Sequence, residues 1–205
     1  MSERDDKALA EDRREYFRVD DAIRLSLRPV PPEEQNDLDA RLQRDQASGF
    51  TVMSSLAAIS AEMVVSMRRI ENSDPDVAAY LKALDRKIEV LGRALIAGDT
   101  ELVDQPAHPV NLSAGGMRVL VDDCYTPGQV LEIRMLLFPS FTGVLLYGDV
   151  VDCEPVPEGE GEGYAYRMRV AFTHLREQDR DLIIRHVLRC QSQALRHQGP
   201  RHDES

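Results

Sequence analysis

The sequence predicts an α+β protein in which antiparallel strands, arranged as a barrel or a sandwich, are interrupted by a helical hairpin and followed by a C-terminal helix. Three observations carry this prediction. Apolar and polar residues alternate in residues 16–29 and in several short segments of residues 107–173, as in half-buried strands. Residues 33–97 change to a helical period. Residues 177–196 repeat that period near the end of the chain.

The overall composition bounds the class of protein before any motif is considered. The 205 residues are 42% hydrophobic and 30% charged, which is typical of a soluble globular protein rather than a disordered chain. The formal net charge of −11 argues against general DNA binding and against docking on anionic lipid, because both need a basic face. No apolar run approaches the roughly 18 residues of a membrane span. We therefore expect no DNA partner and no membrane insertion.

Cysteine usage and the N-terminal segment indicate the compartment. Cys124, Cys153 and Cys190 are far apart and form no C-x-x-C motif, so we expect reduced thiols that serve as small core residues. The first residues, MSERDDKALAEDRREYF, are charged from the third position and contain no secretory apolar core. These features favour a cytoplasmic location.

The first strand is predicted over residues 16–29, directly after the arginines of the segment DRREYFRV. Arg24, Ser26 and Arg28 separate its apolar positions and give the period of two. The segment PVPP, residues 29–32, ends it. The apolar positions are Phe17, Val19, Ile23, Leu25 and Leu27.

The helical hairpin is predicted to have one long arm and one shorter arm. The segment NSDPDV separates them, with Ser73 or Asp74 as the N-cap and Pro75 in the tolerated first turn. Gly98 is expected to end the second arm. Each arm has a seam of heptad spacing: Leu42, Asp45, Gly49, Val52, Leu56, Ile59, Met63, Ser66 and Ile70 in the first, and Val77, Leu81, Leu84, Ile88, Leu91 and Leu95 in the second.

Two roles are open for these seams. They can pack on each other or on the strands within one chain, or they can pack between chains in a helical bundle. Because an isolated two-helix hairpin buries little apolar surface, we favour packing between chains. The seam does not distinguish a dimer from a tetramer.

The second half of the chain returns to short strands separated by turn residues. The segments HPVNLSAGGMRVLVDD, GQVLEIRMLLF, GVLLYGDVVDCE and GYAYRMRVAF are punctuated by Gly-Gly, Pro-Gly and a lone proline. Strands at this spacing predict an antiparallel barrel or sandwich. The C-terminal helix then presents one apolar face made of Ile183, Val187, Cys190 and Ala194, which is expected to pack on the strands.

Two short motifs carry the candidate chemistry. Arg14 and Arg18 form an R-x-x-x-R pattern before the first strand, and Asn111, Ser113 and Gly116 form an N-x-S-x-x-G pattern between two later strands. The amide of Asn111 and the hydroxyl of Ser113 lie two residues apart, hence on one side of an extended backbone. Arginine offers a planar fork of donors that suits phosphate oxygens and guanine edges.

In this order, the two motifs and the strands around them resemble the PilZ domain, the bacterial receptor family for cyclic di-GMP. The resemblance covers residues 11–30 and 107–196. It implies a six-stranded PilZ-type β-barrel and cyclic di-GMP as the ligand. Because no motif in the sequence pairs a nucleophile with a base, we also expect no enzymatic activity and no cofactor. The resemblance also implies that Arg14 and Arg18 belong to an arm that closes over ligand held on the barrel by Asn111, Ser113 and Gly116. Arg13 is expected to add a third arginine contact.

The distance between the motifs departs from a plain PilZ barrel, because 92 residues separate Arg18 from Asn111. We interpret the helices as an insertion between the first two strands that resembles the oligomerising helices of atypical family members. The expected division is an arm and first strand over 1–32, the inserted hairpin over 33–104, the rest of the barrel with the C-terminal helix over 105–197, and a tail over 198–205.

These features predict a cyclic di-GMP effector that changes its surface and its contacts with an unidentified downstream protein. The alternative is a ligand-independent oligomeric adapter that recruits a partner in motility, secretion or exopolysaccharide control. A zinc site on His186 and Cys190, which are four residues apart on the terminal helix, lacks two further ligands at suitable spacing in the sequence. We therefore expect no metal.

Overall fold

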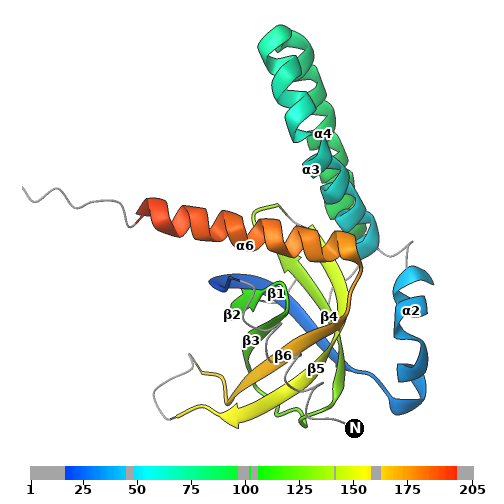
Figure 1. The fold of residues 1–205 in the computed structure, drawn as a ribbon, viewed down its shortest axis with the longest axis vertical. Helices are drawn as coiled ribbons and strands as arrows, with labels where there is room; N and C mark the ends of the chain where they lie inside the picture. Colours follow the sequence, from blue (N-terminus) through cyan, green and yellow to red (C-terminus); the bar gives the residue numbers. More distant parts are fainter. Residues whose placement is uncertain are drawn as a thin grey trace, which may run out of the picture.

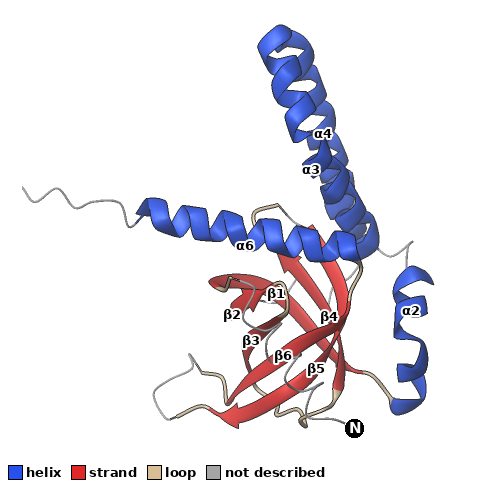
Figure 2. Ribbon diagram, viewed as in Figure 1, coloured by secondary structure: helices blue, strands red, loops and turns tan. Residues whose placement is uncertain are grey.

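A computed structural model of the protein describes residues 17–44, 49–96, 102, 106–140, 142–157 and 163–197. Its architecture is a β-barrel with helices inserted after the first strand and one helix after the last strand (Figures 1 and 2). Within these residues, no helix is long and apolar enough to cross a membrane.

Six antiparallel strands close the barrel, in the spatial order β1-β2-β3-β6-β5-β4. The prediction of a six-stranded antiparallel barrel is therefore confirmed. β1 closes it, because residues Val19 to Ile23 pair with β2 and residues Arg24 to Pro29 pair with β4. The strands are β1 Val19–Pro29, β2 His108–Ser113, β3 Gly116–Val121, β4 Val130–Leu137, β5 Thr142–Pro155 and β6 Tyr166–His174.

The interior of the barrel is filled by the alternating inward side chains that the strand pattern predicts. Ile23, Leu112, Ile133, Leu146 and Met168 come from five different strands and are fully buried in one cluster. Burial at this level stabilises the fold by about 1.5–3 kcal/mol for each large apolar side chain. This continuous core holds the strands of the barrel together.

The helices between β1 and β2 begin with a short 3-10 helix and a short α-helix that lie beside the barrel. The 3-10 helix is η1 Pro32–Asp37, and it is followed by α2 Leu38–Arg44. Leu38 and Leu42 of α2 are buried. Leu42 therefore does not belong to one long arm as the seam predicted, and Asp45, the next seam position, lies outside the described residues.

The helical hairpin itself consists of α3 Gly49–Ser73 and α4 Pro75–Ile96, which pack against each other and extend away from the barrel (Figure 1). Asp74 separates them. Its carboxylate Oδ1 accepts a hydrogen bond from the backbone N–H of Val77 at 3.1 Å, and Pro75 begins the next helix. The predicted break and N-cap are thus confirmed, with Asp74 rather than Ser73 as the cap. Gly98 lies outside the described residues.

A second apolar cluster covers the outer side of β4 and β5. Leu136, Leu145 and Tyr147 point out of the barrel and are buried against α2 and the beginning of α3. The other buried members of this cluster are Val30, Leu38, Leu42, Met53 and Leu102. The inserted helices therefore add a layer to one side of the barrel before the hairpin leaves it.

The C-terminal helix, α6 Glu177–His197, lies across one end of the barrel (Figure 1). Ile183 and Val187 enter the barrel core and Cys190 packs against it, as predicted. Ala194 is exposed because the last turns of α6 extend past the barrel. The expectation that all three cysteines are core residues was wrong for Cys124, which is exposed.

Candidate functional site on the open face of the barrel

A row of polar side chains crosses the outer face of five consecutive strands. Asp20 of β1 pairs with Asn111 of β2, Asn111 with Arg118 of β3, Arg118 with Arg169 of β6, and Arg169 with Asp152 of β5. Directly paired residues place their Cβ atoms about 4.5–5.5 Å apart on the same face. The barrel thus aligns one amide, two guanidinium groups and two carboxylates at its surface.

Arg18 joins this row from the end of the N-terminal arm. Its Nη1 donates to Oδ1 of Asn111 at 3.4 Å, and Nδ2 of Asn111 donates to Oδ1 of Asp20 at 2.8 Å. Two of the residues that the motifs single out therefore meet in space although 92 residues separate them. Arg13 and Arg14 lie outside the described residues.

The electrostatic environment of the row favours an anion. Partial burial lowers the pKa of Arg18, and the positive charges of Arg118 and Arg169 lower it further. The two carboxylates of the row, Asp20 and Asp152, compensate part of this charge: Oδ2 of Asp152 accepts a bond of 2.5 Å from Nε of Arg169, and this bond raises the pKa of Arg169. Three like charges therefore repel one another across the strands, and a bound anion would relieve that repulsion.

Ser113 lies at the turn between β2 and β3 rather than on the exposed row. Its side chain is buried, and its Oγ donates to the backbone carbonyl of Gly116 at 2.9 Å. The adjoining carbonyls are also occupied, since Gly115 accepts from Phe172 N–H at 3.0 Å and Ala114 from Arg180 at 3.3 Å. The Ser113 hydroxyl thus holds the turn in place beside Asn111.

Gly116 allows β3 and β6 to approach each other closely. A Cβ atom at this position would lie 2.4 Å from the backbone oxygen of Val170, which is far inside van der Waals contact. The resemblance implied that this glycine takes part in holding the ligand on the barrel. In the structure it begins β3, and the absence of a side chain is required by the neighbouring strand.

The motifs did not identify Arg118 and Arg169. Both occupy outward positions that alternate with buried Met117, Val119 and Met168, so the strand pattern alone places them on the surface. Their position beside Asn111 depends on which strands pair and in which register. Together with Arg18, they give the face the donors to hold a ligand that carries more than one negative charge.

Comparison with known proteins adds a family model and several similar structures. The family model described as PilZ domain matches residues 85–189. No curated protein matches the chain.

Three solved structures illustrate the similarity. The first is a protein of Xanthomonas campestris, described as a tetrameric PilZ domain self-assembled via a helical bundle, with 17% identity, a TM-score of 0.54, and coverage of 89% of this chain and 90% of that one. The second is the inhibitor of motility MotI/DgrA of Bacillus subtilis, with 12% identity, a TM-score of 0.45, and coverage of 88% and 52%. The third is the PilZ domain of YcgR from Escherichia coli with c-di-GMP, with 16% identity, a TM-score of 0.36, and coverage of 47% and 82%.

The family model spans just over half of the chain, from the second half of α4 through β2 to β6 and into α6. The helices α2, α3 and α4 separate β1 from that block. The closed barrel and the matching family model together identify the chain as a member of the PilZ domain family, whose domains are typically non-catalytic receptors for cyclic di-GMP.

Proposed function

We propose that this protein binds cyclic di-GMP on the open face of its barrel and converts that binding into a new arrangement of its N-terminal arm. The observation that carries the proposal is the contact of Arg18 with Asn111, within a row that also contains Arg118 and Arg169. The family supplies the identity of the ligand.

The chemistry of the ligand matches this set of groups. Cyclic di-GMP has two phosphodiester anions and two guanines, and a guanidinium can bind phosphate oxygens, bind the O6/N7 edge of guanine, or stack on the base. In this proposal Arg13, Arg14 and Arg18 contact the ligand from the arm, and Asn111 contacts it from β2. Ser113 and Gly116 keep the β2–β3 turn in the shape that receives it.

Arg118 and Arg169 extend the binding surface beyond the two motifs. Both guanidinium groups lie on the same face as Asn111, and the repulsion that they exert on Arg18 decreases when a doubly charged ligand lies between them. Arg18 would then exchange its long bond to Asn111 for charge-assisted bonds to the ligand. The arm would be held against the barrel in the bound state and would present a different surface to a downstream protein.

Calorimetric titration of the full chain with cyclic di-GMP tests this proposal. We expect saturable binding by the wild type and a loss of affinity of at least about tenfold, or about 1.4 kcal/mol, in Arg14→Ala and in Arg18→Ala. Arg44→Ala is the matched control, because Arg44 of α2 is an exposed arginine that pairs with Asp37 of η1. Absence of saturable binding by the wild type would contradict the proposal and favour the ligand-independent adapter.

We further propose that the protein self-associates through the helical hairpin. Ile59 and Met63 of α3 and Val77, Ile88 and Leu91 of α4 belong to the two heptad seams, yet they are between 43% and 66% exposed in the single chain. Packing within one chain therefore leaves much of both seams uncovered. The helical bundle described for the Xanthomonas campestris protein supports a second copy of this hairpin as the partner.

Light scattering of a double variant, Met63→Glu and Leu91→Glu, tests self-association separately from ligand binding. We expect an oligomer for the wild type and a monomer for the variant, with unchanged affinity for cyclic di-GMP. Arg86→Glu is the control, because Arg86 is exposed on α4 and lies on a different helical face from the seam. A monomeric wild type would contradict this proposal. If the wild type is an oligomer, its measured mass will also distinguish a dimer from a tetramer.

A further inference from the structure

One inward position of β1 is occupied by a carboxylate. Val19, Ile23 and Leu25 point into the barrel and are buried, and Asp21 falls on the same side of the strand between Val19 and Ile23. Burying a carboxylate costs free energy unless it is paired or bound to a cation. The end of the barrel covered by α6 must therefore supply a partner for Asp21.

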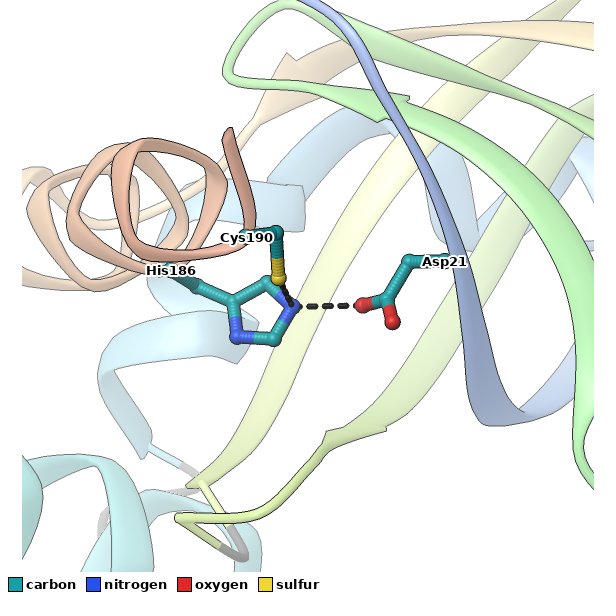
Figure 3. A group of neighbouring side chains, drawn as sticks. All are labelled: Asp21, His186 and Cys190. Carbon is teal, nitrogen blue, oxygen red and sulfur yellow. Dashed lines mark hydrogen bonds and ion pairs between the residues drawn. The ribbon is translucent and has the colours of Figure 1, made fainter. Parts of the chain in front are cut away.

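That partner is a pair of side chains on α6 (Figure 3). Nε2 of His186 lies 2.6 Å from Oδ2 of Asp21, and Sγ of Cys190 lies 3.5 Å from the same Nε2. The three ligand atoms all lie within 4.8 Å of one another. His186 is buried, and the other two residues are half-buried. The sequence indicated only His186 and Cys190, because Asp21 lies 165 residues before His186 in the chain.

We propose that Asp21, His186 and Cys190 form a binding site for a zinc ion that fastens α6 to β1. Oxygen, nitrogen and sulfur are the three ligand atoms that zinc uses in proteins, and three protein ligands leave a fourth position for water. The proposal is independent of cyclic di-GMP, because these residues lie at the barrel end under α6 and not on the open face.

Two of the three separations between these atoms are close to those of a tetrahedral zinc site, and the third, between the Asp21 carboxylate oxygen and Sγ of Cys190, is within 4.8 Å. From ordinary zinc–ligand bond lengths, adjacent nitrogen and sulfur ligands are about 3.5 Å apart, and nitrogen and oxygen ligands are about 3.3 Å apart. The separation of Sγ and Nε2 already has this value. The separation of Nε2 and Oδ2 would lengthen by less than 1 Å, which a rotation of the half-buried Asp21 side chain would supply.

The charges of the site also balance around a divalent cation. The Asp21 carboxylate and a Cys190 thiolate together carry two negative charges, and His186 is a neutral ligand. Burial raises the pKa of Cys190 and the charge of Asp21 raises it further, whereas the charge of Arg189 lowers it. Zinc would replace the proton of the thiol, because a coordinating thiol is deprotonated by the cation.

Arg189 disfavours the His186 tautomer that binds zinc, so replacing Arg189 tests the proposal. Its Nη2 lies 3.0 Å from Nδ1 of His186 and donates to the carbonyl of Phe138 at 3.2 Å. Because a guanidinium only donates, Nδ1 accepts and the ring proton is on Nε2, the atom that zinc needs. Zinc binding would move the ring proton to Nδ1 and break this contact. Arg189→Gln, which offers Nδ1–H an acceptor, should tighten zinc binding.

Titration of the reduced full chain with Co²⁺ and then Zn²⁺ provides the readout. We expect one Co²⁺ per chain, with a thiolate charge-transfer band and the strong visible bands of four-coordinate cobalt, and displacement of both by Zn²⁺. Cys190→Ser should remove the charge-transfer band and lower zinc affinity by more than about 100-fold, since even residues behind the ligands typically change it 10–100-fold. Zinc should also raise the melting temperature of the wild type.

The controls keep the result interpretable. A double variant, Cys124→Ser and Cys153→Ser, should retain the cobalt spectrum, and circular dichroism of each variant checks that it is folded. The proposal is overturned if the wild type binds no stoichiometric Co²⁺, if the double variant loses the spectrum while Cys190→Ser keeps it, or if Arg189→Gln weakens zinc binding in a folded protein. In those cases the contact of His186 with Asp21 is only a structural hydrogen bond.

Discussion

The two outer sides of the barrel differ in what covers them. Over β4 and β5, the outward side chains Leu136, Leu145 and Tyr147 are apolar and buried under α2 and the beginning of α3. Over β2, β3 and β6, the outward positions in the same barrel are Asn111, Arg118 and Arg169, which remain accessible. One side is thus a second core, and the other is a polar surface.

This difference explains how a barrel can accept a long insertion without losing its candidate site. The inserted chain leaves the barrel after Pro29 and returns at His108, while Val19 to Ile23 still pair with β2. The helices turn toward β4 and β5 rather than toward the row. Arg18 therefore lies beside Asn111 although the inserted helices separate the two motifs in the sequence.

The largest loss of stability should come from shortening a buried side chain on the covered side of the barrel. Leu145→Ala removes a side chain that is 3% exposed and contacts the inserted helices, so we expect the free energy of unfolding to decrease by about 2–5 kcal/mol. Denaturant unfolding followed by circular dichroism measures this loss. Leu120→Ala is the matched control on the open side, since Leu120 is an outward, half-buried residue of β3. Equal losses in the two variants would show that the sides do not differ in packing.

A smaller loss is expected on the open side at Gly116. Gly116→Ala places a methyl group against the backbone oxygen of Val170, which cannot rotate away, so β3 and β6 must separate locally. Overpacking of this kind typically costs about 1–3 kcal/mol. Thermal melts should show the loss, and cyclic di-GMP affinity should decrease with it because Asn111 lies beside this turn. An unchanged melting temperature would mean that the strands are less closely packed than the structure indicates.

Local sequence signals predict most of the fold. The period of two identifies the strands, and the switch to a helical period identifies the insertion, because both depend only on neighbouring residues. The break between α3 and α4 was predictable for the same reason, since Asp74 caps the helix that Pro75 begins. Leu42 was misassigned because α2 repeats the helical period of α3, and periodicity alone does not reveal that its apolar face packs on the barrel.

The candidate site depends on relations that no local pattern contains. Arg118 and Arg169 join Asn111 only because β3 lies between β2 and β6 in one particular register. A shift of one residue would turn either side chain into the core. The pairing of Asp21 with His186 likewise joins the first strand to the last helix. Resemblance to a family supplied the motifs, but the added arginines required the assembled barrel.

Charge removal on the two sides should separate ligand binding from stability. Arg169→Ala removes a guanidinium of the open row, so we expect cyclic di-GMP affinity to decrease about tenfold with little change in melting temperature. Arg134→Ala is the comparison, because Arg134 of β4 pairs with Glu132 at 3.0 Å near the covered side. Calorimetry should show unchanged affinity in that variant. Equal losses of cyclic di-GMP affinity in the two variants would indicate a general effect of net charge.

The smallest expected change in stability concerns the contact between α6, at the end of the barrel, and α3 of the helical hairpin. Asp179 of α6 is fully buried, and its Oδ2 accepts a bond of 2.7 Å from Nε of Arg176. Nη2 of Arg176 in turn donates to Oγ of Ser54 on α3 at 3.0 Å. Burial raises the pKa of Asp179 above its ordinary value of 3.8, although the bond to Arg176 opposes that shift.

The sign of the resulting pH dependence follows from proton binding. Between pH 3.8 and the raised pKa, the folded chain holds a proton on Asp179 that the unfolded chain does not, so this group adds stability as pH falls. That contribution is fully present below pH 3.8 and is lost as pH rises through the folded pKa. The stability of the wild type relative to Asp179→Asn should therefore increase as pH decreases from 7 toward 4, measured by denaturant unfolding of both proteins at each pH. A relative stability that decreases over this range would mean that the ion pair with Arg176 outweighs burial, and that the junction between α3 and α6 is held by charge.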